Sequence, residues 1–261
     1  MPERNNTDRI ANVPRIALVA PALAAVAGFI DAVGFITLRG LFVAHMSGNS
    51  VKFGVSAGHG SLAAAAPAGI AVALFVVGVA IGTVAAELAA RRRIRSLAAT
   101  VLSLQAALIL AFMLYGEAIL VGAHVRDRSI SGFYVLAALA VLSMGMQTAA
   151  LRQLAGRTIS TTYVTGVLTS LTQETTNYLF WLRDGGARDE RHSFLTRVLK
   201  LGSRTDSRDR IVVLGAVWIA YFAGGVLGSF SDSKVELWSL LAPLAVLLAL
   251  VFLDLRRPFE L

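Results

Sequence analysis

The sequence contains no cysteine, so disulfide bonds, thiol nucleophiles and thiolate metal sites are all excluded. It is also poor in charge: Asp, Glu, Lys and Arg make up 15% of the 261 residues, whereas soluble domains contain about 25%. Only four histidines are present, and three of them, His59, His124 and His192, fall in separate predicted loops. We therefore expect neither a metal site nor a cofactor.

Apolar residues are abundant, making up 56% of the chain and giving a mean hydropathy of +0.68. Long uncharged runs recur, and a membrane-spanning helix needs roughly 20 such residues. The period-2 alternation of an outer-membrane barrel is absent. We predict an all-α polytopic membrane protein that forms one integral membrane domain over residues 1–261. The run after the polar lead Met1–Arg15 is too long for a cleaved signal peptide, so we expect no cleavage.

Six segments are predicted to span the membrane, and two further segments are helical in pattern but studded with polar residues. The spans are Ile16–Leu38, Ala68–Ala90, Leu97–Tyr115, Ile130–Leu151, Ile211–Phe230 and Leu237–Leu255; the polar segments are Leu41–Ala57 and Ile159–Leu182. If the polar segments do not cross, 19 of the 24 Lys and Arg residues fall on one side, as expected for cytoplasmic loops. We therefore predict that both are re-entrant, broken or interfacial, and that both termini are cytoplasmic.

The net charge of +8 is assigned to these cytoplasmic loops, so nucleic acid is not an expected partner. The longest polar segment, Arg183–Arg210, contains 8 basic and 5 acidic residues. It is interpreted as an ordinary cytoplasmic loop, with contact to a partner or to anionic lipid as the alternative.

An internal repeat is predicted between residues 16–115 and 130–255. Gly28-Phe29-Ile30-Asp31-Ala32 is echoed by Gly145-Met146-Gln147-Thr148-Ala149, and Met46-Ser47-Gly48-Asn49 by Val164-Thr165-Gly166-Val167. Three crossings in each half would place the halves in opposite orientations, as in the inverted repeats of secondary transporters. Chance similarity between helices rich in small residues is the alternative.

The first half supplies the more conspicuous candidate site. Asp31 lies within an apolar run, where a carboxylate costs about 2.5–3.5 kcal/mol to insert. It is predicted either to couple an ion or proton, or to bind substrate, or to lock the next segment onto its helix. His45 could carry a proton or simply donate a hydrogen bond. Ser47, Gly48 and Asn49 are predicted to break the helix and expose ion-binding backbone, or else to allow close packing.

The second half offers Gln147, Thr162, Thr165 and Gly166 as the other half of the site. Five threonines form one helical stripe that could line a polar path or hydrogen-bond to carbonyls one turn earlier: Thr161, Thr165, Thr169, Thr172 and Thr176. Gly224 and Gly228 lie inside a predicted span, where their spacing indicates close helix packing rather than a phosphate-binding loop.

These motifs resemble the YoaK-like family of bacterial inner-membrane proteins. The first family motif is roughly G-x-x-D-A followed by F-x-x-x-x-T-G-N, which Gly28–Ala32 and Phe42–Asn49 match with Ser47 in place of Thr. In the second half, Thr148 stands where the family pattern has Asn. The resemblance implies an inner-membrane protein with about six helices and supplies no substrate, because the family has no assigned function.

Our leading hypothesis is a small secondary transporter or permease, not an enzyme, coupled to protons or ions through Asp31. One alternative is a membrane-embedded enzyme acting on a lipid. The other is a non-transporting sensor or assembly module. The expected partners are the lipid bilayer and a small solute or ion, with a homo-oligomer left open.

Overall fold

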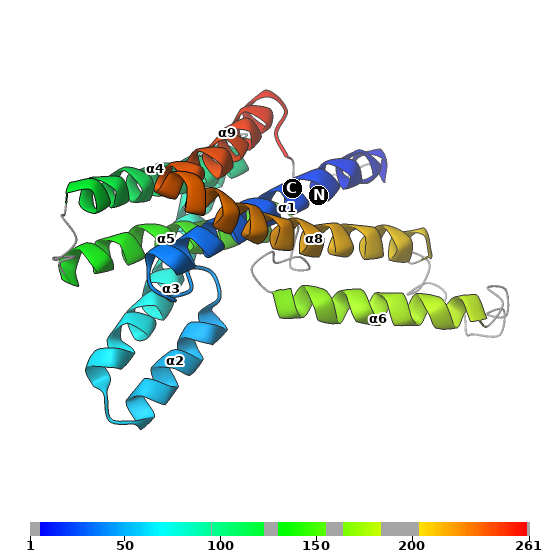
Figure 1. The fold of residues 1–261 in the computed structure, drawn as a ribbon. Helices are drawn as coiled ribbons and strands as arrows, with labels where there is room; N and C mark the ends of the chain where they lie inside the picture. The colour runs from blue at the N-terminus through cyan, green and yellow to red at the C-terminus, as the bar shows by residue number, and fades with distance from the viewer. Residues whose placement is uncertain (1–5, 95, 123–129, 155–163, 184–203, 260–261) are drawn as a thin grey trace.

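Helices account for all regular structure in the described residues, which are 6–94, 96–122, 130–154, 164–183 and 204–259 of this computed structural model. The elements are shown in Figure 1 and have these bounds: α1 (Asn6–Thr37), α2 (Met46–Gly58), α3 (Leu62–Arg91), α4 (Leu97–Gly122), α5 (Ile130–Leu154), α6 (Val164–Arg183), α8 (Arg204–Val235), the 3-10 helix η3 (Glu236–Leu240) and α9 (Leu241–Arg256).

Five segments of the described chain are long and apolar enough to cross a membrane. They are Leu18–Thr37, Leu62–Arg91, Leu97–Ile119, Ser131–Leu151 and Arg210–Arg256. The last segment is 47 residues long and comprises most of α8, all of η3 and all of α9. Its interruption lies at Glu236, whose φ of 49° is in the left-handed region. The predicted all-α membrane fold is thereby confirmed.

Two helix pairs approach through glycines, which have no side chain to hold the backbones apart. In the first pair, α1 crosses α8, and a Cβ at Gly28 would overlap the carbonyl oxygen of Tyr221. In the second, α5 crosses α3, and a Cβ at Gly145 would lie 2.5 Å from the carbonyl oxygen of Phe75. The predicted packing role of Gly224 and Gly228 is confirmed, because both face the backbone of α1.

The polar-studded segments form the outlying arms of two hairpins. Helix α2 packs against the first half of α3, where Phe53 covers Gly69. Helix α6 packs against the first half of α8, and an ion pair of 3.0 Å joins Glu174 to Arg210. In Figure 1 the α2–α3 hairpin extends below the bundle, and the α6–α8 hairpin extends to its right.

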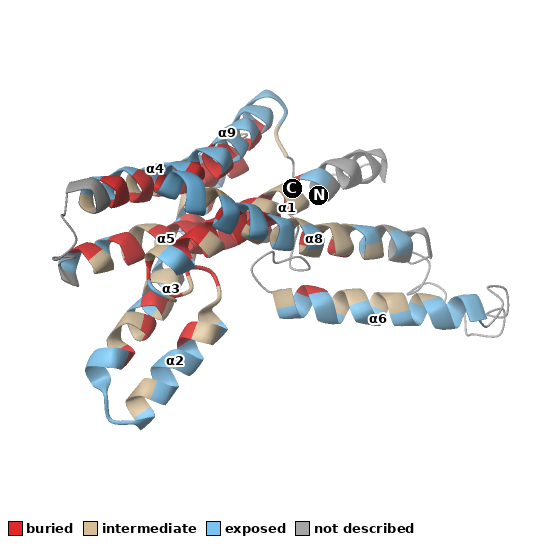
Figure 2. Ribbon diagram, in the orientation of Figure 1, coloured by how far each residue is buried: buried red, intermediate tan, exposed pale blue. Residues whose placement is uncertain are grey.

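The core lies where α1, α4 and α5 meet, and the outer helices cover it (Figure 2). In the apolar segments of α1 and α5, 67% and 72% of the residues are buried, against 22% in α3. Large apolar side chains remain exposed along α3, α8 and α9, as expected where helices face lipid tails. The candidate site therefore lies on a central helix, α1, close to its outer partner α8.

Candidate functional site

Helix α1 ends in a left-handed turn. Arg39 and Gly40 have φ values of 54° and 86°, and the Gly40 N–H donates a 2.7 Å hydrogen bond to the carbonyl of Phe35. Such a turn is a common C-terminal helix stop. The chain then runs without regular structure until α2 begins at Met46.

The position of the helix break corrects one prediction. Ser47, Gly48 and Asn49 do not interrupt a helix, because they lie in the first turn of α2. The break precedes them, over residues 38–45. It occurs there because side chains outside the loop supply its backbone hydrogen bonds, and at membrane depth irregular backbone needs such partners.

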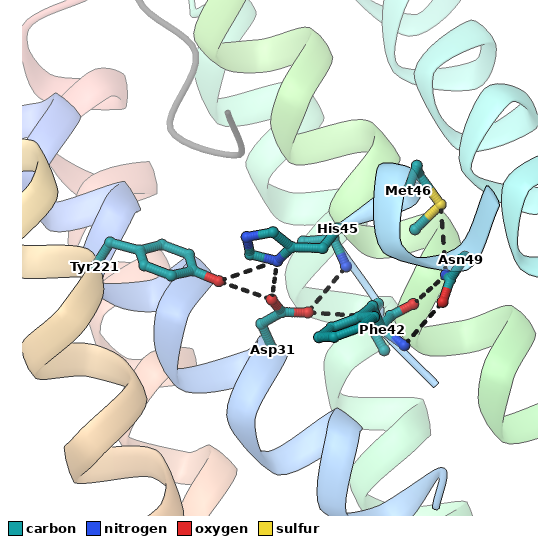
Figure 3. A network of polar contacts seen from close by, with 8 residues as sticks. Asp31, Phe42, His45, Met46, Asn49 and Tyr221 are labelled. Carbon is teal, nitrogen blue, oxygen red and sulfur yellow. Dashed lines mark hydrogen bonds and ion pairs between the residues drawn. The ribbon is translucent and has the colours of Figure 1, made fainter. Parts of the chain in front are cut away.

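Asp31 supplies the first of these partners. Its side chain is 6% exposed, and Oδ1 accepts hydrogen bonds from the N–H groups of Val43 at 3.1 Å and Ala44 at 3.0 Å. Figure 3 shows the carboxylate on α1 pointing at this loop. Asp31 therefore locks the loop onto α1, which is one of the roles predicted for it.

The other oxygen of Asp31 binds two side chains. Oδ2 accepts a hydrogen bond from His45 Nδ1 and another, of 2.7 Å, from the hydroxyl of Tyr221. The Tyr221 oxygen also lies 3.3 Å from His45 Nδ1, so the three groups form a closed triangle (Figure 3). Asp31 thus joins α1, the α1–α2 loop and α8.

His45 lies in that loop, outside all the candidate spans. The hydrogen bond and the charge of Asp31 raise the pKa of His45 above its ordinary value, although partial burial of the imidazole acts in the opposite direction. Because Nδ1 faces Asp31, the second ring nitrogen points away from the carboxylate (Figure 3). The His45 side chain is 28% exposed, against 7% for that of Asp31, so the imidazole is the more accessible group of this pair.

Asn49 supplies the second set of loop partners. Its side chain is fully buried; Oδ1 accepts a 3.1 Å hydrogen bond from the N–H of Phe42, and Nδ2 donates one of 2.7 Å to the carbonyl of Phe42. Gly48 leaves space for the Phe42 ring, because a Cβ there would lie 2.8 Å from the ring edge. Asn49 is a brace for the loop, whereas Ser47 is exposed on α2.

A groove of about 790 Å³ lies over the triangle, between α1 and α8. It is lined by Asp31, His45 and Tyr221 together with Phe42 and several apolar residues of α8. An accessible groove beside a charged triad gives a small molecule, water or a proton a route to His45.

The predicted residues of the second half do not form a matching cluster. Gln147 is buried, donates a 2.7 Å hydrogen bond to the carbonyl of Leu23 and accepts one of 2.6 Å from Gln105. It thus ties α5 to α1 and α4. Thr165 and Gly166 are exposed in the first turn of α6, and Thr162 lies outside the described residues.

One threonine of the stripe on α6 hydrogen-bonds to a carbonyl one turn earlier, which is one of the two roles predicted for the stripe. The hydroxyl of Thr169 donates a 2.8 Å hydrogen bond to the carbonyl of Thr165, one turn earlier. The other described threonines of the stripe are exposed on the helix surface. Thr161 lies outside the described residues, as do residues 184–203 of the basic loop, while Arg204–Arg210 form the first turns of α8.

Tyr221 is the member of the site that sequence reasoning missed. It lies in an apolar run and far along the chain from Asp31, so proximity along the sequence gave no indication of it. One signal was available: a hydroxyl inside a span, one turn before the small pair Gly224-Gly225, where the helix could approach a partner closely.

The fold and this site define a polytopic helical membrane protein whose first helix is followed by a braced, irregular loop. The chain belongs to the family described as "Protein of unknown function (DUF1275)", which matches residues 19–253. It is 29% identical over 155 residues to the UPF0700 transmembrane protein YoaK of Bacillus subtilis (strain 168). That match covers 59% of this chain and 65% of the relative. No solved structure matches the chain.

Proposed function

We propose that this protein is a small secondary transporter with six membrane crossings in two inverted repeats, coupled to protons through the His45–Asp31 pair. The proposal makes it a carrier of a small solute and not an enzyme. It places the protein in the inner membrane of a bacterium. Three independent features support it: the register of the glycine crossings, the distribution of charge and the geometry of the Asp31 triangle.

The register of the two glycine crossings supports the repeat. The contact residues of α5 follow those of α1 at one constant spacing along the chain. The contact residues of α8 follow those of α3 at a second constant spacing. The corresponding pairs are Ala25 and Leu142, Gly28 and Gly145, Phe29 and Met146, Phe75 and Tyr221, Gly78 and Gly224, and Gly82 and Gly228. Agreement of both registers at once supports a repeat over chance similarity of small-residue helices.

Helix starts extend the correspondence. Helices α2 and α6 begin at Met46 and Val164, the positions that the sequence comparison aligned. Each packs against the helix that follows it, α2 against α3 and α6 against α8, as two equivalent repeats require. The 47-residue segment Arg210–Arg256 has room for two crossings, with its interruption near the middle, which brings the count to six.

Charge supports the orientation. With six crossings, the basic residues of Arg91–Arg95, the segment before α8 and the C-terminal Arg256–Arg257 share one side, which the positive-inside rule assigns to the cytoplasm. The Asp31 triangle, α2 and the α4–α5 connection then lie toward the opposite, outer side.

The single observation that carries the coupling proposal is the triangle of Asp31, His45 and Tyr221. Four donors already occupy the carboxylate, which fills the acceptor positions that it has. A further ion or substrate donor would have to displace one of them. Among the described residues, no group hydrogen-bonds to the second ring nitrogen of His45, so we assign proton binding to His45 and its positioning to Asp31. Gain or loss of that proton changes the tie between the loop and α8.

Reconstitution tests this assignment. Purified protein in proteoliposomes that contain a pH-sensitive dye is challenged with a panel of small metabolites, and proton movement is followed for wild type, His45→Gln and Asp31→Asn. We expect solute-dependent proton flux in wild type and its loss in both variants. Asp254→Asn is the matched control, because Asp254 is a buried carboxylate whose partners are the backbone amides of Ala99 and Phe259, each at 2.7 Å.

Two results would contradict the proposal. A wild-type protein that moves no member of the panel removes the transport function. Variants that fold and still couple solute to protons as wild type does remove the role of His45.

The inverted topology has its own test. Because the chain has no cysteine, single cysteines at Ser61 and Thr172 can be labelled without background. Both positions are exposed, one between α2 and α3 and the other on α6. Labelling of Ser61→Cys from outside and of Thr172→Cys from the cytoplasm is expected; labelling of both from one side would contradict the inverted repeats.

A further inference from the structure

A second hollow also lies beside the end of α1, and it shares no lining residue with the Asp31 groove. Its volume is about 720 Å³, within the range of small-molecule sites. The C-terminal turn of α1, one face of α2, the start of α3 and the start of α5 form its wall. Nothing described so far uses this hollow, which we call the Arg39–Lys52 pocket after its two charged residues.

Both charges in the pocket are positive. Arg39 and Lys52 line it, and no Asp or Glu does. Within the described ranges, neither cation forms an ion pair with a carboxylate. Both residues are exposed, and cations on the wall of an otherwise apolar hollow favour the binding of an anion through charge-assisted hydrogen bonds.

The two cations are held at the pocket by the protein itself. Lys52 donates a hydrogen bond to the carbonyl of Gly40, and its Nζ lies 4.9 Å from the ring centre of Phe42 and 5.4 Å from that of Phe35. Arg39 occupies the left-handed turn with a φ of 54°, a conformation that costs a non-glycine residue about 1 kcal/mol or more. This turn is the C-terminal stop of α1, and it places Arg39 on the cavity wall.

The rest of the wall would accommodate an apolar body. Leu38, Leu41, Phe133 and Leu136 contribute large apolar side chains, and Ala63, Ala64 and Pro67 contribute small ones. The hydroxyl-bearing side chains of Ser56 and Tyr134 add hydrogen-bonding capacity. A free inorganic ion would leave most of this surface uncovered.

We propose that the Arg39–Lys52 pocket binds an anion, a carboxylate or a phosphate, that carries an apolar chain, with the two cations holding the charge and the α1, α3 and α5 walls covering the chain. Assigning this anion as the transported solute rests on the function proposed above, whereas binding in the pocket stands by itself. Free acids and anionic lipid headgroups both have this chemistry, so the test must distinguish them.

The pocket also adjoins the Asp31 triangle. Phe42 lies between the two, with Lys52 over its ring on one side and the ring of His45 at a centroid distance of 5.7 Å. Asn49 fixes the backbone of Phe42. An anion that draws Lys52 away from Phe42 therefore acts on the residue that packs against His45.

Binding is measured on the full-length protein in phosphatidylcholine nanodiscs, with radiolabelled octanoate and radiolabelled dihexanoyl phosphatidate as separate probes. Octanol and inorganic phosphate are the competitors, because one has the chain without the charge and the other the charge without the chain. We expect at least one probe to bind saturably and neither competitor to displace it at equal concentration. The probe that binds identifies the source: octanoate a free acid, and phosphatidate a lipid headgroup.

Variants connect binding to the pocket. Arg39→Gln with Lys52→Gln is expected to weaken binding by about tenfold or more, because two charge-assisted hydrogen bonds are lost. Arg39→Lys with Lys52→Arg keeps both charges and is expected to stay much closer to wild type. The matched control is Lys234→Gln with Arg256→Gln, since these cations also lie over aromatic rings, Phe230 at 5.9 Å and Phe252 at 4.2 Å, but outside the pocket.

The results separate the pocket from the transporter. The pocket proposal is overturned if neither probe binds, or if the double Gln variant binds as well as wild type. It is also overturned if the control variant loses as much binding, or if octanol displaces the probe. If the double Gln variant is not monodisperse, the single variants Arg39→Gln and Lys52→Gln are used instead. Each is expected to lose less binding affinity than the double variant. Binding without flux contradicts only the transport function, and flux without binding contradicts only the pocket.

Discussion

The hydroxyl of Tyr221 donates a 2.7 Å hydrogen bond to Asp31, and so joins helices whose contact residues are 190 positions apart in the chain. The bond lies directly beside the crossing at Gly28, where the backbones of α1 and α8 touch. In the second crossing, between α3 and α5, Gly145 faces the carbonyl of Phe75, much as Gly28 faces that of Tyr221. One crossing thus carries a hydroxyl at its contact, and the other carries a plain aromatic ring.

Replacing Tyr221 with Phe gives the first crossing the residue of the second. We expect the ring to pack as before and the protein to lose about 1.5–3 kcal/mol of stability, the usual value of a hydrogen bond to a charged group. Unfolding by SDS titration in mixed micelles measures the change. Tyr115→Phe on α4 is the control, because Tyr115 is exposed, and it should have a smaller effect; equal losses would contradict a special role for Tyr221.

The protonation of His45 should depend on Asp31. Asp31 raises the pKa of His45 through its hydrogen bond and its charge, while burial lowers it. In Asp31→Asn only the lowering effect remains, so the pKa is expected to fall below about 6.5, the ordinary histidine value. Imidazole resonances titrated by NMR, and assigned with His45→Gln, give the answer. An unchanged His45 titration would show that Asp31 does not control the proton.

The same pair predicts a pH-dependent stability. Because the folded-state pKa of His45 is raised, its contribution to stability is fully present below the unfolded value near 6.5. The contribution is lost as the pH rises through the higher folded-state pKa. The difference in melting temperature between wild type and His45→Gln should therefore be largest at about pH 5 and shrink toward about pH 9. A difference that grows with pH would contradict the assignment.

Asn49 should matter more than any exposed amide. Asn49→Ala removes two hydrogen bonds from the backbone of Phe42, and we expect a loss of about 2–3 kcal/mol together with faster hydrogen exchange in residues 38–45. Asn177→Ala, on the exposed surface of α6, is the matched control and should change stability by less than about 0.5 kcal/mol. Hydrogen exchange that spreads evenly over the chain would argue against a local brace.

Two glycines of α8 provide a paired test of the crossing. Gly224→Ala places a Cβ against the carbonyl oxygen of Ala25, so the helices must move apart and stability should fall by about 1–3 kcal/mol. Gly215 has open space around it, so Gly215→Ala should be neutral or stabilising by up to about 1 kcal/mol. The free energy of unfolding of both variants is measured in the same detergent. Similar changes in the two variants would contradict the close contact at Gly224.

The sequence predicted the apolar helices well, because length and hydropathy define a span with little help from packing. The starts of the first and fifth predicted spans, Ile16 and Ile211, agree with the candidate spans that begin at Leu18 and Arg210. The helices themselves begin earlier, α1 at Asn6 and α8 at Arg204, since polar turns continue a helix beyond its apolar part. Hydropathy has no information about those polar turns.

Two of the three residues in the Asp31 triangle were predicted. Asp31 and His45 are near each other in sequence, so a chain reversal after α1 was sufficient to bring them together. Tyr221 required knowledge of which helices touch, and that depends on packing between distant segments. The helix break was predicted a few residues too late, because Gly48 and Asn49 are typical of breaks but here pack against Phe42 from inside α2.

The glycine face of α1 has a partner that is synthesised much later. The Gly28 face of α1 is covered by α8, which leaves the ribosome about 190 residues after Asp31. At 5–20 residues per second, α1 remains in the membrane for roughly 10–40 seconds before its partner is made. During that time the bare glycine stripe and the Asp31 carboxylate lack their partner on α8. The nascent chain is therefore expected to need lipid, the insertion machinery or another helix to cover α1 until translation reaches Tyr221.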